Sequence, residues 1–340
     1  MIKMARLTLS LFTVVAPFST LSCNRSGGNS PASAGAVVLY TSVDEPYVRP
    51  LIDRFQKETG IAVTLLTDTE AAKSVGLAER IRAERDHPRC DVWWDNEVFL
   101  SARLAGEGIL MPYDSPAAAD IPAAYKNPGH LWAGSVLRVR VLVSSPGITG
   151  SLGPARSLTD LLRPEWKGKI AIARPTAGTT GGHVAALYAA WGERRADEFF
   201  RRLHDNGVTL VGGNSIVADS VGNGDFAAGL CDNDDAASTQ GGGKKIDMNL
   251  PDQTDAGEGT LAMPCAVAMV NGCPHSQNAK KLIDFLLSSK VDAALIDAKF
   301  AWCSTRDTAK AGKLMKVDYQ AVAEAMPQNI RRATMILEGR

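Results

Sequence analysis

The sequence lacks an excess of charge of either sign. Lysine plus arginine and aspartate plus glutamate each number 37, so the formal net charge at pH 7 is zero. A protein that binds nucleic acid or an anionic membrane surface usually carries a basic excess, because phosphate charges have to be neutralised. The composition therefore argues against a nucleic-acid partner.

Long hydrophobic runs and the common catalytic motifs are also missing. After Cys23 no apolar run is long enough to cross a bilayer, so we expect contact with the membrane through a lipid anchor only. No HExxH, GxSxG, CxxC or P-loop sequence occurs, and the five histidines form no close pair. Nothing in the chain indicates a hydrolase, a zinc ribbon or a thioredoxin-type site. We expect no enzymatic activity and no required cofactor.

The first 23 residues have the pattern of an export signal. Lys3 and Arg6 give a positively charged start, and residues 7–18 form an apolar region that is long enough for a signal peptide but too short to span a bilayer. This pattern predicts an exported protein, located in the periplasm or at the cell surface.

A cysteine ends this segment and is a candidate for lipid attachment. The sequence around Cys23, Thr-Leu-Ser-Cys, resembles a bacterial lipobox, with Thr20 where that pattern prefers leucine. Residues 24–36 contain no bulky apolar side chain and predict a flexible tether. We expect a lipid-anchored protein, and ordinary secretion with cleavage nearby is the alternative.

The cysteine count limits disulfide formation. The chain has six cysteines, and lipidation of Cys23 leaves an odd number, so at least one thiol stays free. Export permits disulfides, but the sequence does not fix a connectivity among the others, which are Cys90, Cys231, Cys265, Cys273 and Cys303.

Strand and helix patterns alternate in the first part of the body. Residues 37–40 (VVLY) and 61–66 (IAVTLL) are apolar runs of strand type, and apolar side chains recur at helical spacing between them before Gly60. A β-α-β unit of this kind implies parallel strands. Further on we expect helices over residues 78–84 and 99–104 and a strand over 90–94.

Two later passages have the pattern of strands that connect two lobes. Residues 136–143 alternate apolar residues with Arg138 and Arg140, as a strand with one solvent-exposed face does, and residues 262–270 form a second apolar run. The approximately 300 residues after the tether are enough for two lobes. Other elements are expected as strands over 169–173 and 226–230 and as helices over 183–191 and 279–287.

The fold class predicted from this order is α/β, with two lobes joined by a two-strand hinge. Residues 1–23 form the signal peptide and 24–36 the tether. The expected lobes are an N-lobe over 37–137 and a C-lobe over 138–263, with 264–340 supplying a return strand to the N-lobe and the C-terminal helices.

Polar groups gather at the ends of the predicted strands. A Gly/Thr-rich turn precedes the helix at residue 183, and unpaired backbone N–H groups there favour an anion; an ordinary strand-to-helix turn is the alternative. An acidic cluster follows the strand at 226–230 and favours a cation, with a solvated surface loop as the alternative. The ligand-binding candidates are Thr41, Ser42, Thr179, Thr180, Gly181, Asn214 and Ser215, and the metal-binding candidates are Asp44, Glu97, Asp234 and Asp235.

Several segments, taken in order, resemble the ferric-type solute-binding proteins of bacterial ABC importers. They are VVLYTSVDEPYVRPLIDRFQKETGIAV, CDVWWDNEVFLSARLAGEGIL, LLRPEWKGKIAIARPTAGTTGG, GNGDFAAGLCDNDDA and AVAMVNGCPHSQNAKKLIDFLLS. The resemblance implies a two-lobed type II periplasmic-binding-protein fold, a "Venus flytrap" that closes on a solute and delivers it to a permease. Ferric members carry adjacent tyrosines where Asp234 and Asp235 stand here.

The resemblance implies a solute-binding protein that captures ferric iron or another metal, Fe³⁺ or divalent, by lobe closure. Carboxylates also suit divalent metals or an ammonium group. The first alternative is a binding protein for a phosphonate, a sugar phosphate or another small phosphorylated or zwitterionic solute. A metal-dependent cell-surface enzyme and the ligand-binding subunit of a sensor are the others. The expected partners are ABC permease and ATPase subunits, with the protein itself a monomer.

Overall fold

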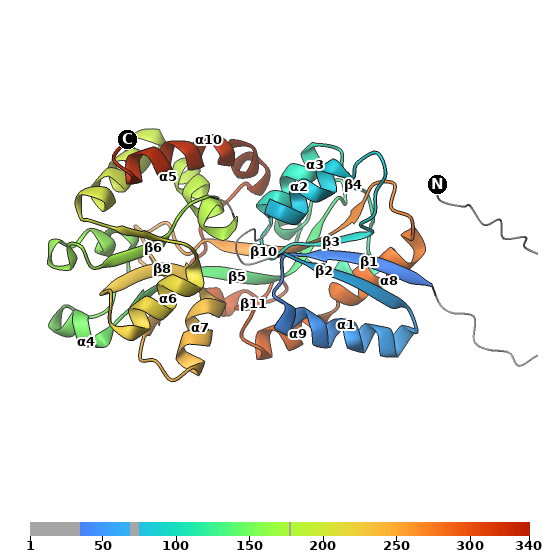
Figure 1. Cartoon of the computed structure of the whole chain (residues 1–340), viewed down its shortest axis with the longest axis horizontal. Helices are drawn as coiled ribbons and strands as arrows, with labels where there is room; N and C mark the ends of the chain where they lie inside the picture. The colour runs from blue at the N-terminus through green and yellow to red at the C-terminus, as the bar shows by residue number, and fades with distance from the viewer. Residues whose placement is uncertain (1–34, 69–74, 177) are drawn as a thin grey trace, which may run out of the picture. The chain divides into compact units, whose positions relative to one another are not determined.

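The computed structural model describes residues 35–68, 75–176 and 178–340 (Figure 1). The predicted signal peptide, the lipid-attachment candidate Cys23 and nearly all of the predicted tether lie outside the described residues. No helix in the described ranges is both long and apolar enough to cross a membrane.

The β-α-β prediction is confirmed at the start of the body. Strand β1 (Ala36–Thr41) pairs in parallel with β2 (Ala62–Thr67) and with β3 (Val92–Trp94). Helix α1 (Glu45–Thr59) joins the first two strands and ends at Gly60, whose φ of 70° is the left-handed conformation that glycine adopts without a Cβ clash. Helices α2 (Val75–Ala83) and α3 (Phe99–Gly106) follow β2 and β3.

The two predicted connecting strands pair with each other. Strand β5 (Ala133–Ser144) runs antiparallel to β10 (Ala262–Val270), with Ala262 opposite Val139 and Val267 opposite Ala133. The path of the sheet is β2-β1-β3-β10-β5-β8-β6-β7, so β5 and β10 stand at its centre (Figure 1). Strand β5 belongs to both halves, because it pairs with β11 (Cys303–Ser304) near its start and with β9 (Asp247–Asn249) near its end.

The prediction of a solvent-exposed face on β5 is wrong. All 12 residues of the strand are buried, and Arg138 and Arg140 are 3% and 0% exposed. The alternation of apolar and charged residues is real, but the charged face meets buried acidic partners in place of water.

The second half of the sheet is also parallel within itself. Strand β6 (Ile170–Ala173) pairs with β7 (Thr209–Val211) and β8 (Ala228–Asp232). Helices α5 (Gly178–Asp205), α6 (Asn214–Asn223) and α7 (Asn233–Gly241) follow β6, β7 and β8 in turn. Helix α5 begins five residues before the expected start at residue 183 and is interrupted at Gly192, where φ is 72°.

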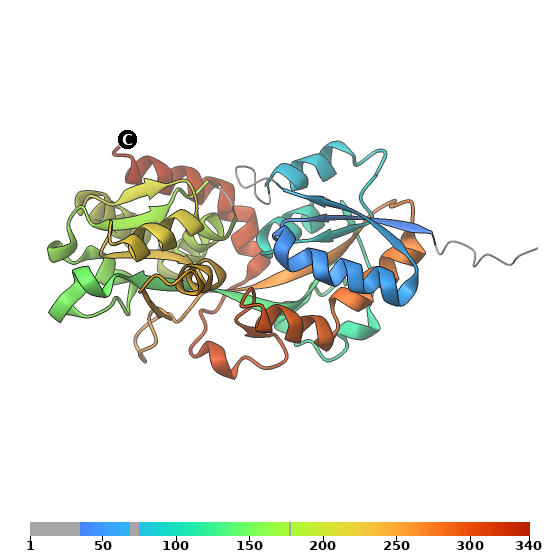
Figure 2. The ribbon, with the colours of Figure 1, turned by 60° about the horizontal axis from the view of Figure 1, so that its bottom comes forward.

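The C-terminal segment returns to both halves. Helix α8 (Ser276–Leu286) lies against β1 and β10, and α9 (Ser289–Asp297) lies against β5 and β11. Helix α10 (Tyr319–Leu337) lies along α5 and also contacts α3, as Figures 1 and 2 show. The remaining short elements are β4 (Leu110–Met111), α4 (Pro146–Thr149) and 3-10 turns over Pro116–Ala118, Ala123–Tyr125, Gly150–Leu152, Leu158–Leu162, Pro164–Trp166 and Ala309–Ala311.

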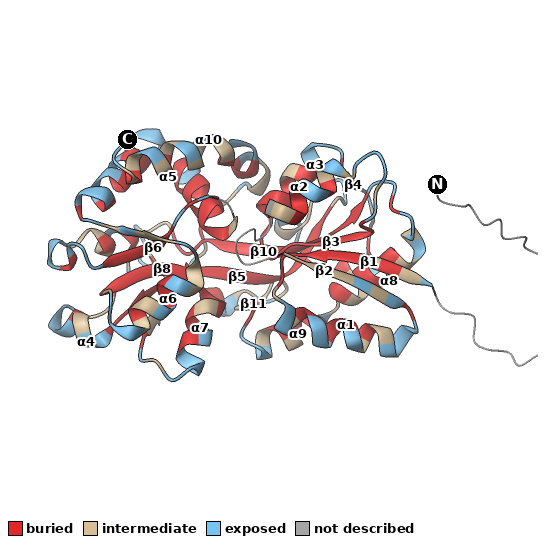
Figure 3. Cartoon of the chain, in the orientation of Figure 1, coloured by how far each residue is buried: buried red, intermediate tan, exposed pale blue. Residues whose placement is uncertain are grey.

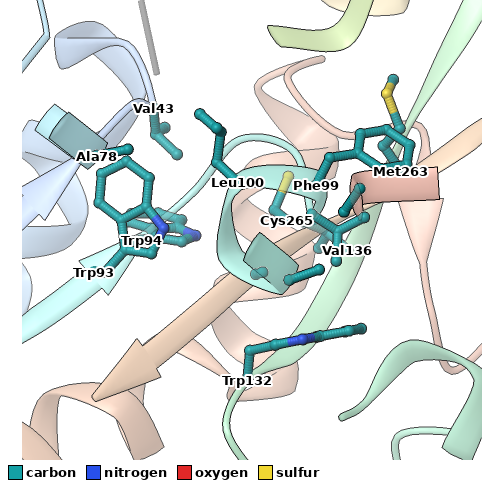
Figure 4. Packing of buried hydrophobic residues seen from close by; sticks show 14 of the residues in the cluster. Val43, Ala78, Trp93, Trp94, Phe99, Leu100, Trp132, Val136, Met263 and Cys265 are labelled. Atoms are coloured by element: carbon teal, nitrogen blue, oxygen red, sulfur yellow. The ribbon is translucent and has the colours of Figure 1, made fainter. Parts of the chain in front are cut away.

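The core follows the central strands, which are buried along their length (Figure 3). Trp93 and Trp94 are almost fully buried, and their rings lie near Ala78 and Leu100, while Cys265 of β10 lies beside Phe99 (Figure 4). The five cysteines of the described part of the chain are buried free thiols. The expectation that at least one thiol stays free is consistent with this arrangement, in which none of these five cysteines forms a disulfide.

Candidate functional site

The centre of the candidate site is a buried group of two arginines and two aspartates. Strand β5 faces β8 so that Arg140 stands directly opposite Asp232, and Arg140 Nη1 lies 2.6 Å from Asp232 Oδ1. Arg138 Nη2 lies 2.6 Å from Asp234 Oδ1 and 3.2 Å from Asp232 Oδ2. All four side chains are at most 5% exposed, so water screens these charges little.

The charges shift one another's proton affinities. Burial acts to lower the pKa of Arg138, but the charges of Asp234 and Asp232 outweigh it and hold that pKa well above the usual value. Burial acts to raise the pKa of Asp232, yet Arg140 and Arg138 hold it below its ordinary value. The pKa of Asp234 is raised, because burial and the charge of Asp232 outweigh the effect of Arg138. Asp232 is therefore a carboxylate that both guanidinium groups stabilise.

Three of the predicted ligand-binding residues join this group. Thr179 Oγ1 donates a hydrogen bond to Asp232 Oδ2 at 2.7 Å, and Arg140 Nη1 donates to Thr179 Oγ1 at 3.3 Å. Asn214 Oδ1 accepts from Arg140 Nη1 at 3.1 Å and from Thr180 Oγ1 at 3.1 Å. The first turns of α5 and α6 therefore meet at the end of β8.

Two other predicted residues are placed differently. A Cβ on Gly181 would lie 2.7 Å from Ile330 Cδ1, so this glycine lets α10 approach α5 closely. Ser215 follows Asn214 in the first turn of α6 and is half-buried.

Two buried donors in the arginine group have no partner. Among the described residues, neither Arg138 Nε nor Arg140 Nε forms a hydrogen bond. An unpaired buried donor is costly, and an oxygen atom of a bound ligand would satisfy it. The group is thus complementary to an anionic or carbonyl oxygen.

The candidates in the first half of the chain are engaged with their neighbours. Ser42 Oγ donates to Asp95 Oδ1 at 3.0 Å, and Thr41 Oγ1 donates to the carbonyl oxygen of Trp94 at 2.7 Å. These bonds hold the end of β1 against the segment that follows β3. Both hydroxyl groups therefore have a structural role in this arrangement.

Glu97 is a buried carboxyl group at the start of α3. It accepts hydrogen bonds from the backbone N–H groups of Phe99 and Leu100, which are otherwise unpaired at a helix N-terminus. Burial and the nearby Asp95 raise the pKa of Glu97 well above its usual value, and burial raises the pKa of Asp95 to about 7. The carbonyl oxygen of Asn96, between them, accepts from Arg138 Nη1 at 3.5 Å.

Acidic residues from both halves raise the pKa of a half-buried tyrosine that the sequence reasoning missed. The pKa of Tyr47 is raised by burial and then by the charges of Asp234 and Asp44, with a smaller effect from Asp235. The Tyr47 ring lies 4.9 Å from that of Phe300, and the Arg138 guanidinium lies 5.2 Å from the Phe300 ring. The predicted metal candidates Asp44, Asp234 and Asp235 all raise the pKa of this tyrosine, and Asp234 also contacts Arg138.

One set of carboxylates has the spacing of a cation site. Oxygen atoms of Asp232, Asp234 and Asp235 all lie within 4.8 Å of one another. Carboxylate oxygens are suitable ligands for hard cations such as Ca²⁺, Mg²⁺ and Mn²⁺. Since Arg138 and Arg140 already contact two of the three residues, the site has mixed charge and suits a ligand that carries both signs.

The mixed-charge site lies at the junction of two half-sheets, and a comparison with known protein families shows which class of protein has this arrangement. Residues 37–300 match the family model described as "Bacterial extracellular solute-binding protein", and the chain belongs to that family. The two-lobed type II fold expected from the resemblance is confirmed.

The most informative relatives differ in the ligand that their names state. The chain is 27% identical over 318 residues to "Iron uptake protein A1" of Synechocystis sp., a match that covers 87% of this chain and 86% of the relative. It is 25% identical over 285 residues to the "Putative 2-aminoethylphosphonate-binding periplasmic protein" of Salmonella paratyphi A, a match that covers 81% of this chain and 80% of the relative. Iron-bound HitA from Pseudomonas aeruginosa has a TM-score of 0.77 at 22% identity, covering 88% of this chain and 99% of that one, which shows the shared fold.

Sequence reasoning missed the residues at the centre of the site. Arg138 and Arg140 were not among the candidates, and Asp232 was considered only as part of the acidic cluster, although a signal for all three was present. Two arginines two positions apart on a strand otherwise rich in valine and leucine point to one face of a sheet. A buried strand with such a face requires acidic partners, and Asp232 belongs to an acidic cluster that directly follows an apolar run.

Proposed function

We propose that this chain is the exported solute-binding protein of an ABC importer and captures a metal ion, ferric or divalent, by lobe closure. The observation that carries the metal assignment is the trio of carboxylates from Asp232, Asp234 and Asp235, whose oxygen atoms lie within 4.8 Å of one another. The iron-related name of one relative supports the same ligand class. The protein acts by binding and release, as a monomer with a permease and an ATPase as its partners.

The mixed charge of the site favours a metal that arrives with an anion. Arg138 neutralises part of the negative charge of Asp234. A bare cation therefore binds less favourably here than at a purely acidic cluster. In our proposal Asp235 and Asp44 face the cation, and the unpaired Nε groups of Arg138 and Arg140 donate to oxygen atoms of the anion. Tyr47, whose pKa is raised by burial and by the same carboxylates, is a further candidate ligand.

Closure brings residues from both halves of the chain to the solute. Asp44 follows β1, whereas Asp234 and Asp235 begin α7, and β5 and β10 connect the two halves. A solute that touches both sets binds the closed arrangement more tightly than the open one, and this difference in affinity drives closure. The closed form is the one that the permease recognises in this scheme.

A second candidate ligand is a phosphonate or a sugar phosphate. Thr179 and Thr180 lie in the first turn of α5, where the positive end of the helix dipole favours an anion, and Arg140 and Asn214 contact the same hydroxyl groups. The phosphonate-related name of another relative supports this class. An amino group on the same solute would face the carboxylates of α7.

Calorimetry with ferric citrate, Mn²⁺ and 2-aminoethylphosphonate separates these ligands. We expect Asp234→Asn and Asp235→Asn to weaken metal binding by about 10- to 100-fold each, since every tenfold loss corresponds to about 1.4 kcal/mol of charge-assisted contact. Asp225→Asn, an exposed acidic residue before β8, is the matched control and should bind normally.

Two calorimetric results would contradict the metal assignment. Tight binding of aminoethylphosphonate, with no heat from ferric citrate or Mn²⁺, would replace the metal by the phosphonate. Unchanged affinity for every solute in both variants would remove the acidic cluster from the site.

We also propose that Cys23 carries a lipid after export. The apolar signal region and the lipobox-like sequence before this cysteine support the proposal. A Cys23→Ala variant should appear in the soluble fraction of cells that retain the wild-type protein in their membranes, and a Ser22→Ala variant should remain in the membranes. Intact mass measurement checks the modification, because wild-type protein whose mass equals that of the unlipidated mature chain would contradict it.

A further inference from the structure

A cavity lies between α7 and the segment that follows α9. Its volume is about 500 Å³, within the range of about 300–1,000 Å³ that is typical of small-molecule sites. Its wall combines one face of α7 with the end of α9 and the chain that leads to β11. The lining residues are Asn233, Ala237, Gln240, Gly241, Met248, Ile296, Lys299, Ala301, Trp302 and Lys310.

This cavity is on the other side of β5 from the arginine group. Side chains alternate between the two faces of a strand, so Leu137, Val139 and Val141 point away from Arg138 and Arg140. Those three apolar residues belong to a core cluster against which Met248 and Trp302 pack. Because Met248 and Trp302 line the cavity, it lies on the apolar face of β5 and is separate from the proposed solute site.

The wall of the cavity has an apolar floor and a positive rim. Trp302 Nε1 donates to the carbonyl oxygen of Lys310 at 2.9 Å, so the indole N–H is satisfied and the rest of the ring is apolar surface. Lys299 and Lys310 both line the cavity and are exposed. No acidic side chain is among the described residues that line the cavity.

Asn233 fixes the boundary between the cavity and the sheet. Its Oδ1 atom accepts from the backbone N–H of Val139 at 2.9 Å, and its Nδ2 atom donates to the carbonyl oxygen of Phe300 at 3.1 Å. This side chain therefore joins α7 to the segment after α9, and the walls of the cavity are held together by a buried contact.

We propose that this cavity binds a small carboxylate with an apolar body. The apolar part lies against Trp302, Met248 and Ile296, and the carboxylate lies at the rim between the ammonium groups of Lys299 and Lys310. Charge complementarity selects the carboxylate over a cation or a neutral molecule of the same shape, because two positive side chains and no negative ones line the site.

Calorimetry on the full-length protein with decanoate tests the proposal. Decanol and decylammonium have the same ten-carbon chain and serve as the neutral and the positively charged comparison ligands. We expect decanoate to bind and decylammonium not to bind. Lys299→Gln and Lys310→Gln should each weaken decanoate binding by about three- to tenfold and leave the weaker binding of decanol unchanged. Lys290→Gln, an exposed lysine at the start of α9, is the matched control and should bind as the wild type does.

A variant that fills the cavity tests whether decanoate binds there. Ala237→Trp puts an indole into the cavity from α7 and should abolish the binding of both decanoate and decanol, while circular dichroism reports that the protein is folded. Decanoate binding that survives Ala237→Trp, or that is equal in the wild type and in a Lys299→Gln/Lys310→Gln double variant, would overturn the proposal. The absence of any decanoate binding to the wild type would overturn it as well.

Discussion

Replacement of Arg140 by alanine should lower the free energy of unfolding by about 3–5 kcal/mol, the usual cost of removing one partner of a buried ion pair. Arg140 is fully buried, and its Nη1 atom lies 2.6 Å from Asp232 Oδ1. The variant leaves the Asp232 carboxylate buried with Arg138 as its one remaining cationic partner. It also removes one of two donors to Asn214 Oδ1 and one of two donors to Thr179 Oγ1. Urea denaturation at pH 7 measures the effect.

Two comparison variants show whether the loss comes from the unpaired charge. Arg54→Ala breaks an exposed pair with Glu58 on α1 and should cost less than about 1 kcal/mol. An Arg140→Met/Asp232→Leu double variant removes both charges and should recover much of the stability that Arg140→Ala loses. A double variant that is less stable than Arg140→Ala would contradict this view of the pair.

The stability of the protein should fall towards acid pH partly because of His183. This imidazole is 2% exposed on α5, and among the described residues neither of its ring nitrogens has a hydrogen-bond partner. Burial, with a smaller contribution from Arg140, lowers its pKa from 6.5 to about 3. In the folded protein the ring therefore stays neutral at pH values where the unfolded chain takes up a proton.

The sign of the pH dependence follows from this lowered pKa. The neutral ring contributes its full share of stability above pH 6.5, and that share is lost as the pH falls towards about 3. Between pH 7 and pH 4.5 the loss should be about 2–3 kcal/mol, since one pKa unit corresponds to 1.36 kcal/mol. A His183→Phe variant removes the titrating group and should be the more stable protein at pH 4.5.

The difference between the two proteins, measured by urea denaturation at both pH values, isolates His183 from the other groups that titrate in acid. His87→Gln, at an exposed histidine, is the control and should follow the wild type at both pH values. A His183→Phe variant that loses as much stability as the wild type between pH 7 and pH 4.5 would contradict the assignment.

The parts of the fold that could be predicted are those with local signals. The spacing of Val48, Leu51, Ile52 and Phe55 places one apolar face on α1, and all four side chains are buried. The parallel pairing of β1 with β2 follows from the helix between them. The range expected for β10 agrees with the structure residue for residue, because an uninterrupted apolar run is typical of a strand that is buried on both faces.

The parts that could not be predicted depend on contacts that are distant in the sequence. Arg138 meets Asp234 across 96 residues, and no local signal in the sequence specifies the pairing of β5 with β8 that brings the charged face of β5 to its acidic partners. The position of Glu97 after a strand predicts a metal ligand, yet its carboxylate accepts hydrogen bonds from the first N–H groups of α3. Local sequence identifies polar residues at strand ends, but it does not say which of them are used by the fold.

Small-angle X-ray scattering with and without solute tests the central claim, that a solute closes two halves joined by β5 and β10. The solute is the ligand that calorimetry has shown to bind, at a concentration that saturates the site. The account predicts a smaller radius of gyration for the saturated wild-type protein, and no change when the same solute is added to an Asp234→Asn/Asp235→Asn variant. A radius of gyration that is the same for the free and the saturated wild-type protein would contradict closure as the mechanism of capture.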